Sequence, residues 1–366
     1  MLTLAHVTPS IIALETVVPP TVLLQHDVRD VFAAQPGLSR LAQRLVPATF
    51  DAAAIETRHS AIAELSWESG AEHPLFFLPA SGLLLSPSTR VRNELYTEQA
   101  GQLYVEAAKK ACASLDTDRI THVITVSCTG FFAPGPDFLV ARELGLRPGV
   151  QRFHLGFMGC YASMPALRLA RQLVLADPAA VVLVVSVELC TLHVRSSSDP
   201  DQIIAASIFA DGAAAAVVAA DAVEGFGCSL DAFESVVTPV GEADMAWTIG
   251  DEGFEMVLSS YVPKIIDEYI EGALEPLLQG RAGEVERWAI HPGGRSILDR
   301  VQSTLKLSDE QLTPSRETLR DFGNMSSATV LFVLKNILAT ATPGERICAM
   351  AFGPGLTVES GLMTAN

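Results

Sequence analysis

Two β-branched runs restrict the possible folds of this chain more than any other feature of its sequence. Residues 121–128 (THVITVSC) are rich in β-branched side chains, and residues 179–190 (AAVVLVVSVELC) are almost wholly apolar. Such runs are typical of parallel strands that are buried on both faces of a sheet. Helical patterns accompany them, with an amphipathic stretch over Thr97–Ala113 and a second helix over residues 138–145. The alternation predicts an α/β architecture with buried sheets.

The second half of the chain shows the same alternation. We predict a β-rich segment over residues 223–239, a long helix over Val257–Leu278, a short strand over Glu286–Ile290, a helix over Arg295–Leu305 with a polar connector after it, an apolar helix over Ser326–Leu338 and a closing pair of strands over residues 345–363. Each half consists of βα units that end in a polar loop, which is consistent with an ancient duplication. We therefore divide the chain into an N-terminal half, residues 1–222, and a C-terminal half, residues 223–366.

Other parts of the N-terminal half are less regular. We expect a strand over residues 3–18, a break at Pro19-Pro20, a helix over residues 21–33, and a mixed segment over Leu38–Phe50 with Arg40 and Arg44 on one helical face. Residues 51–80 look irregular, and residues 206–220 form a loop followed by a strand or by a packed segment of small residues.

The composition excludes several classes of function. The 366 residues carry a formal net charge of −17, which argues against nucleic acid or an anionic membrane as the main partner. The run Ala179–Val187 is shorter than the ~18 residues of a membrane span, and the N-terminus lacks the basic segment of a signal peptide. The six cysteines are scattered, without a CxxC pair or a histidine at ligand spacing. We therefore expect no metal, no disulfide framework and a soluble cytoplasmic protein.

The stretch Phe153–Leu173 contains the first candidate for catalysis. An apolar run ends at Gly159-Cys160, and apolar residues then recur at helical spacing. This pattern predicts a strand that turns into a helix, with Cys160 at or near the helix N-terminus. The positive end of the helix dipole would lower the pKa of a thiol at that position and favour the thiolate. The alternative is a buried structural cysteine.

Two later loops resemble the cysteine loop in kind. His291 stands where a strand ends, before Pro292 and two glycines, and Asn324 follows a glycine directly before a helix. Cysteine, histidine and asparagine together suit thioester chemistry, because the thiolate can take an acyl group while the other two donate to a developing oxyanion or enolate. Taken singly, His291 could be an ordinary loop or core residue and Asn324 a helix N-cap.

Four motifs carry a specific resemblance. GCYA with Cys160, HPGG with His291, GNMSSATV with Asn324 and AFGPGLTVE over residues 351–359 resemble the signature set of type III polyketide synthases, the chalcone-synthase-like family. Their order and spacing match along nearly the whole chain. The resemblance implies a thiolase-like α/β fold, with αβαβα layers built from two similar halves, and a homodimer.

The family also implies roles for these residues. Cys160 resembles the nucleophile that takes the starter from acyl-CoA and holds the growing chain. His291 and Asn324 resemble the pair that polarises the malonyl-CoA thioester and stabilises the enolate left by loss of CO2, and His291 would hold Cys160 as a thiolate in an ion pair. CoA thioesters are the implied substrates, and no cofactor is required.

Further residues match family positions around the cavity. Phe209 resembles a gatekeeper phenylalanine, although it could be an ordinary core aromatic, and Met256 stands at the second gatekeeper position. The resemblance implies cavity-lining positions for Cys128, His193 and Cys190, a position facing the partner's cavity for Ala133, supporting roles for Glu188 and Ser326, CoA-phosphate contacts for Arg44 and Arg40, and a pantetheine contact for Ser296. Arg295 has no counterpart in the family pattern, but it directly follows HPGG and could also face the mouth of the CoA tunnel. The alternative for each of these arginines is a solvated face.

The segments around Cys128, Cys160 and Cys190 look closest to bacterial members that make alkylpyrones or alkylresorcinols from medium- or long-chain fatty acyl-CoA. Small or flexible residues at these positions would leave room for an alkyl chain. The alternatives are a malonyl-only synthase of the naphthalene-forming branch, a ketoacyl synthase of the KAS III type, and an inactive acyl-CoA-binding paralogue. A KAS III enzyme would have an HQAN-like run at the histidine, and the intact Cys160, His291 and Asn324 argue against the inactive paralogue.

Overall fold

A computed structural model describes residues 7–66, 72–220 and 226–366. Its main feature is a mixed nine-stranded sheet. The strand order is β13 (Arg287–Ile290), β14 (Arg346–Gly353), β15 (Thr357–Ala365), β10 (Cys228–Val237), β1 (Ser10–Val17), β9 (Asp211–Ala219), β8 (Val181–Leu189), β6 (His122–Ser127) and β7 (Gln151–Gly156). β6 runs parallel to both β7 and β8. The two β-branched runs are thus neighbouring parallel strands, as their sequence predicted.

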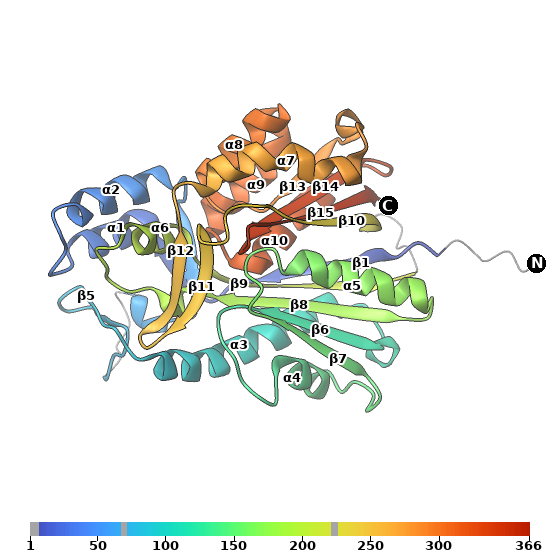
Figure 1. Cartoon of the computed structure of the whole chain (residues 1–366). Helices are drawn as coiled ribbons and strands as arrows, with labels where there is room; N and C mark the ends of the chain where they lie inside the picture. The colour runs from blue at the N-terminus through green and yellow to red at the C-terminus, as the bar shows by residue number, and fades with distance from the viewer. Residues whose placement is uncertain (1–6, 67–71, 221–225) are drawn as a thin grey trace, which may run out of the picture.

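Helices lie on both sides of this sheet and between its two parts. The parts meet at β1 and β10, which pair only through Ser10 with Ser229 and Ile11 with Cys228. α5 (Ser163–Ala176) and α10 (Thr329–Leu338) fill the space between them, α7 (Val262–Leu278), α8 (Arg295–Leu305) and α9 (Asp309–Phe322) cover one outer face, and α3 (Thr89–Ala111) and α4 (Pro136–Glu143) cover the other (Figure 1). The five layers follow the order αβαβα, so the predicted thiolase-like α/β fold is confirmed.

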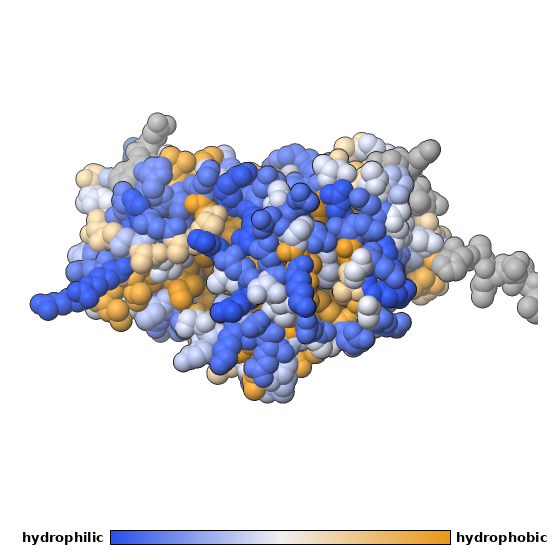
Figure 2. All heavy atoms as spheres, turned by 90° about the horizontal axis from the view of Figure 1, so that it is seen from above, coloured by the Kyte–Doolittle hydropathy of each residue, from blue (hydrophilic) through white to orange (hydrophobic). Residues whose placement is uncertain are grey.

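The chemistry of the middle strands explains this layering. Every residue of β6, β8 and β9 is buried, so these strands need helices on both faces. Ala213, Ala214, Ala215 and Ala216 of β9 are small enough for α3 and α5 to approach closely from opposite sides. The outer helices show the reverse pattern: the face seen from above is mainly hydrophilic, with separate small hydrophobic patches (Figure 2).

Two smaller groups of elements cover the end of the molecule where the site lies. One consists of α1 (Gln25–Ala33), α2 (Ala42–Ala52), α6 (Pro200–Ile208) and the strand pair β2 (Thr21–Leu24) and β3 (Thr57–Ser60). The other is the hairpin of β11 (Met245–Gly250) and β12 (Gly253–Leu258), which packs beside α6 (Figure 1). Short elements complete the fold: β4 (Phe77–Leu78), β5 (Leu83–Leu84) and the 3₁₀ turns η1 (Ala63–Leu65), η2 (Thr117–Arg119), η3 (Cys190–His193), η4 (Ala282–Glu284) and η5 (Ser326–Ala328).

Several predicted segments were wrong. The helix expected over residues 21–33 begins at Gln25, because residues 21–24 pair with β3 as a strand. The helix expected from Val257 begins at Val262, since residues 257 and 258 belong to the hairpin. α6 was not expected and extends to Ile208, into the start of the loop predicted from residue 206, and α9 replaces the polar connector. α9 is amphipathic and begins with a capping box formed by Ser308 and Gln311.

Within the described residues, no helix combines the length and the apolar character that crossing a bilayer requires. All six cysteines are free thiols and all are buried. Part of the strand expected over residues 3–18 lies outside the described residues; its described portion contains β1.

Candidate active site

Cys160, His291 and Asn324 reach one cavity from three different elements. Cys160 lies in the turn between β7 and α5, His291 directly follows β13, and Asn324 lies between α9 and η5. The turn at Cys160 depends on Gly159, which has φ +86°, and a Cβ there would stand 2.5 Å from the Pro354 ring. Only glycine allows this approach. All three side chains are buried and line a cavity of about 570 Å³.

Burial determines the charge of the cysteine and the histidine. It raises the pKa of the Cys160 thiol to about 12, although a hydrogen bond from Ser326 partly opposes this. It lowers the pKa of His291 to about 3. The expected lowering of the Cys160 pKa by the helix dipole is not found, because α5 begins only at Ser163 and the thiol is removed from water. Both shifts favour a neutral thiol and a neutral imidazole over the thiolate–imidazolium pair that the resemblance implies.

The imidazole of His291 is open to a ligand. Neither of its ring nitrogens has a hydrogen-bond partner among the described residues, although both are buried. A neutral imidazole carries one donor and one acceptor. Buried polar groups without partners are uncommon in folded proteins. A substrate in the cavity could therefore receive a hydrogen bond from one nitrogen, while the other is free to take up a proton.

The amide of Asn324 is held in one orientation. Its Oδ1 accepts from the backbone N–H of Ser326 at 2.9 Å, and its Nδ2 donates to the carbonyl of Gly293 at 3.3 Å. The NH2 group therefore faces the HPGG loop that carries His291. One N–H donates to Gly293, and the amide also hydrogen-bonds the Cys160 sulfur, so its second N–H points to the place where a substrate oxygen would lie beside the thiol.

A hydrogen-bonded network centred on Glu188 lies behind the thiol of Cys128. The buried carboxylate accepts from the Cys128 N–H at 3.0 Å, from Thr129 Oγ1 at 2.9 Å and from the Ser327 hydroxyl. The Cys128 sulfur lies 3.3 Å from Ser326 Oγ, and Ser326 adopts φ +46°, which is uncommon outside glycine. Burial raises the pKa of Glu188, and these hydrogen bonds oppose the rise. This carboxylate is fully engaged and supports the wall of the site.

The comparisons with known proteins agree along the whole chain. Residues 3–222 match the family model of the N-terminal domain of chalcone and stilbene synthases, and residues 230–365 match that of the C-terminal domain. This chain belongs to the chalcone and stilbene synthase family. It is therefore a type III polyketide synthase, an acyltransferase of the class that condenses malonyl-CoA units with loss of CO2.

Two relatives and two solved structures illustrate the range of the family. A bisdemethoxycurcumin synthase of Oryza sativa subsp. japonica is 36% identical over 304 residues, 77% of this chain and 75% of the rice protein. The alpha-pyrone synthesis polyketide synthase-like Pks18 of Mycobacterium tuberculosis is 34% identical over 287 residues, 75% of this chain and 73% of Pks18. PKS-I of the brown alga Ectocarpus siliculosus superposes over 100% of both chains with a TM-score of 0.91 and 29% identity. The type III domain of Steely1 from Dictyostelium gives a TM-score of 0.88 and 26% identity over 98% of this chain and 99% of that domain.

The synthase brings most of the predicted cavity residues together. Phe209, Met256, Arg295 and Ser296 line the main cavity beside Cys160. Phe209 and Met256 also line two smaller cavities of about 20 Å³ each: Cys128, Cys190 and Ser326 border one, and His193 and Cys190 border the other.

Three predicted residues lie outside this group. Ala133 is in the loop between β6 and α4 and borders none of these three cavities. Arg44 is on an exposed part of α2. Arg40 precedes that helix, so the expectation that both arginines share one helical face was wrong.

The β11–β12 hairpin supplies cavity residues that the sequence analysis missed. Met245 and Leu258 line the main cavity, and Trp247 lines both small ones. The Trp247 indole N–H donates to the carbonyl of Cys128 at 2.8 Å, which fixes the hairpin against the wall of the site. Alternating apolar residues on either side of Gly250–Gly253 are a hairpin signal that could have revealed this element.

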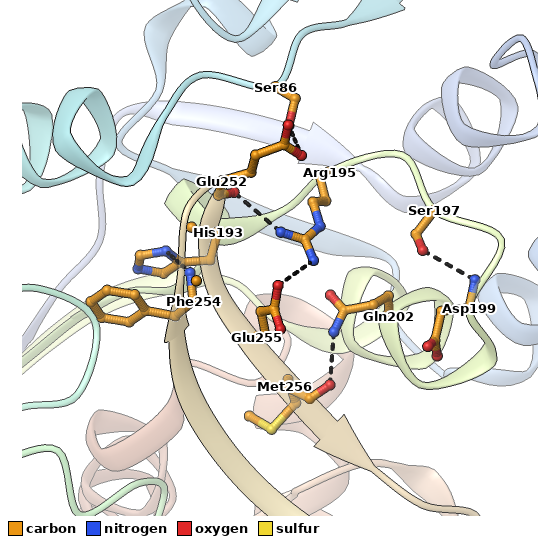
Figure 3. A network of polar contacts seen from close by, with 12 residues as sticks. Ser86, His193, Arg195, Ser197, Asp199, Gln202, Glu252, Phe254, Glu255 and Met256 are labelled. Atoms are coloured by element: carbon orange, nitrogen blue, oxygen red, sulfur yellow. Dashed lines mark hydrogen bonds and ion pairs between the residues drawn. The ribbon is translucent and has the colours of Figure 1, made fainter.

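Side chains from α6 and the segment before it hold the other strand of the hairpin (Figure 3). Gln202 donates to the carbonyl of Met256 at 2.8 Å, and Arg195 pairs with Glu255 at 3.1 Å. His193 stacks on Phe254 with ring centroids 4.1 Å apart. The backbone position of Met256 is thus fixed from outside the cavity.

Proposed function

We propose that this synthase takes a medium- or long-chain fatty acyl starter from acyl-CoA onto Cys160, extends it with two or three malonyl units, and releases an alkylpyrone or an alkylresorcinol. The observation that supports a fatty starter best is the succession of apolar spaces beyond Cys160. The main cavity, about 570 Å³, has the size of a ligand site.

Further spaces continue from it. Phe209 and Met256 line both the main cavity and a small one, and Val194 and Ala206 line both that small cavity and one of about 250 Å³ beneath α1. The lining of this last cavity is mostly apolar but includes Arg58 and Asp27. A flexible alkyl tail could bend past Phe209 and Met256 into this row of cavities, whereas a rigid aromatic ring is too wide for a cavity of about 20 Å³.

The first step in this proposal is transfer of the acyl group to Cys160. The Cys160 sulfur attacks the thioester carbonyl while its proton passes to a nitrogen of His291, which starts neutral and without a partner. The new bond joins Cys160 Sγ to the acyl carbon, the carbon–sulfur bond to CoA breaks, and the CoA thiolate takes the proton from His291. Because the proton moves during the attack, no resident thiolate is needed.

The second step is decarboxylation of malonyl-CoA. The thioester oxygen would accept hydrogen bonds from a nitrogen of His291 and from Asn324 Nδ2, and loss of CO2 leaves an enolate on that oxygen. The enolate carbon then attacks the acyl group on Cys160. The new carbon–carbon bond forms as the Sγ–acyl bond breaks, so the chain, two carbons longer, becomes a CoA thioester, and the Cys160 thiolate that leaves takes a proton from solvent. Two fixed donors stabilise the developing charge, and loss of one such donor typically costs ~10²–10³-fold in rate. Departure of CO2 itself generates the carbanion, so Glu188 is not required as a base.

The CoA moiety would lie at the mouth of the main cavity. Ala48 and Ala52 of α2 line that cavity, and Arg44 is one helical turn before Ala48 on the same face. Arg44 is thus in reach of phosphates that leave the cavity there, with Arg40 further out. Ser296 would contact the pantetheine arm. Arg295 also lines the mouth, although Asp299 pairs with it at 3.5 Å.

We also propose a homodimer in the cytoplasm. β7 is an edge strand of the main sheet, and Phe131, Phe138 and Phe153 are each more than a third exposed on and near it. An exposed edge strand beside large apolar side chains is a surface that another chain usually covers. Ala133 lies in the loop next to Phe131, where it could approach a partner. Six buried free thiols suit a reducing compartment.

Product analysis tests this function. The purified synthase receives malonyl-CoA with starters from acetyl-CoA to long-chain acyl-CoA and with an aromatic acyl-CoA, and products are identified by mass spectrometry. We expect pyrones or resorcinols whose mass follows the alkyl chain, and none from Cys160→Ala. A malonyl-only aromatic product would move the enzyme to the naphthalene-forming branch. Product only from a carrier-protein starter, or none, would contradict the proposal.

A further inference from the structure

A buried cation lies behind Phe209 and Asn324. Arg58, on β3, exposes only 2% of its surface. Its Nη1 donates to the carbonyls of Ala206 at 2.7 Å and Phe209 at 2.8 Å. Both carbonyls belong to the C-terminal end of α6, where backbone acceptors lack partners within the helix. A cation is also favourable at this negative end of the helix dipole. Arg58 thus caps the helix that ends at Phe209.

The same side chain packs against the loop that carries Asn324. Gly323 has φ +70°, and a Cβ there would stand 3.0 Å from Cγ and 3.1 Å from Cδ of Arg58. The Asn324 N–H donates to the Ile208 carbonyl, and the Ala210 N–H donates to the Asn324 carbonyl, both at 2.9 Å. The end of α6 and the Asn324 loop are therefore joined, and Arg58 contacts both.

The charge of Arg58 is only partly compensated. Burial lowers its pKa to about 10, against the opposing influence of Asp211. Its Nε and Nη2 have no hydrogen-bond partner among the described residues. A buried cation with unmade hydrogen bonds is costly, and an apolar side chain of similar volume often gives equal or higher stability. Stability alone therefore does not account for an arginine here; the carbonyls that its Nη1 holds are a better reason.

We infer that Arg58 is a positioning residue for malonyl-CoA decarboxylation. By holding the Ala206 and Phe209 carbonyls, it fixes the backbone to which Asn324 is bonded, and thus the place of the Asn324 amide in the cavity. This inference rests on the role proposed above for Asn324. Cys160 comes from a different element, the turn before α5, to which Arg58 donates no hydrogen bond. Burial dominates the pKa of Cys160, and the hydrogen bond with Asn324 is a smaller influence than that with Ser326. Loss of Arg58 should therefore impair decarboxylation far more than it changes the reactivity of the thiol.

The test separates these two properties without depending on the starter. CO2 release is measured with malonyl-CoA alone, and Cys160 reactivity is measured as the rate of iodoacetamide labelling, with the labelled peptide identified by mass spectrometry. Arg58→Met keeps the length and apolar volume of the side chain but removes the charge and the donors. We expect its kcat for decarboxylation to fall about 10²-fold, the cost of a displaced catalytic group, with KM unchanged and the labelling rate changed far less. Arg58→Lys, which keeps the charge and one donor group, should recover part of kcat.

Arg92→Met is the matched control. Arg92 is also fully buried, its pKa is also lowered to about 10 by burial, and it donates to the carbonyls of Leu192, Val194 and Pro87. Neither Phe209 nor Asn324 is among its acceptors. In this variant we expect both properties to fall together, in proportion to the folded fraction measured by circular dichroism.

Two results would overturn the inference. One is normal decarboxylation by Arg58→Met when Asn324→Ala is defective; the other is a parallel loss of both properties in Arg58→Met, as in the control. Normal decarboxylation by Asn324→Ala would instead refute the role of Asn324 on which the inference rests. If Arg58→Met does not fold, Arg58→Gln replaces it, because it keeps a neutral donor but removes the charge, and it should also lower kcat far more than it changes the labelling rate.

Discussion

Two buried histidines near the Cys160 site, His193 and His291, differ in their hydrogen bonding. This difference distinguishes a structural histidine from a candidate for catalysis. Burial lowers the pKa of both His193 and His291 to about 3. His193 has both nitrogens bonded: Nε2 donates to the Thr129 carbonyl at 2.8 Å, and Nδ1 accepts from the Phe254 N–H at 3.0 Å. His291 has neither nitrogen bonded within the described residues. Burial and a shifted pKa are therefore shared by a structural and a catalytic candidate.

The difference lies in the unused hydrogen-bonding capacity. Around His193 the hairpin, the Cys128 loop and Phe254 satisfy the polar atoms, so this region fixes the wall of the cavity. Around His291 both ring nitrogens remain without a partner in the described residues, so a thioester oxygen in the cavity could accept a hydrogen bond from one of them. A perturbed pKa is a weak guide to function by itself. In this synthase, the unpaired donor next to a cavity is the more discriminating sign.

Replacing each histidine by alanine gives the largest expected contrast. His291→Ala should lower malonyl-CoA decarboxylation ~10²–10³-fold, because one of two donors to the enolate is lost, and should leave the melting temperature nearly unchanged. His193→Ala should lower the melting temperature, because the Thr129 carbonyl and the Phe254 N–H lose their partner. Its decarboxylation rate per folded molecule should stay close to that of the parent. CO2 release and thermal unfolding, measured on the same samples, check both statements.

The opposite pattern would break the comparison. If His193→Ala loses decarboxylation while remaining fully folded, the hydrogen bonds of His193 do not mark it as structural. His193→Gln serves as a further control, because its amide can both donate and accept and should recover part of the stability.

The two histidines should act alike in the acid unfolding of the protein. Each has a pKa of about 3 in the folded state and 6.5 as its ordinary value. Between these values the unfolded chain binds a proton that the folded chain does not. Stability is therefore complete above pH 6.5 and falls as the pH drops toward 3, by about 1.4 kcal/mol per pH unit for each histidine.

Other groups titrate in the same range, so the histidine contribution is measured as a difference between proteins. Burial raises the pKa of Asp211 from 3.8 to about 6, which gives a slope of the opposite sign in that window. Urea unfolding from pH 4 to pH 7 should show a smaller slope for His193→Gln and for His291→Gln than for the parent, by the same amount. Unequal changes would mean that one histidine is charged in the folded state.

Much of the fold and the central trio of residues could be predicted because their signals are local. The β-branched runs at 121–128 and 179–190 determine buried strands whatever surrounds them. Cys160, His291 and Asn324 each lie in a short glycine-containing motif at the end of an element. Their convergence on one cavity followed from the family resemblance, and their geometry agrees with it.

The remainder depends on contacts between distant segments. Burial dominates the pKa of Cys160, and no local sequence pattern indicates that burial. The predicted lowering of this pKa by the helix dipole was therefore wrong. Arg58 acts on residues about 150 and 265 positions away in the chain. α9 was missed because its sequence is polar overall; its capping box was a local signal that could have been used.

The smallest expected effect concerns Trp247 on the structural side of the comparison. Trp247→Phe removes the donor to the Cys128 carbonyl, and a lost hydrogen bond of this kind costs about 1 kcal/mol of stability. Decarboxylation should not change, because His291 and Asn324 come from other elements. The smaller ring should enlarge the two small cavities that Trp247 borders, so products from longer starters should gain relative to short ones. Urea unfolding measures the change in stability, and competition between two acyl-CoA starters measures the change in product ratio.

If stability falls while the product ratio stays constant, Trp247 supports the cavity wall but the alkyl tail does not reach it. The tail must then lie along the main cavity alone.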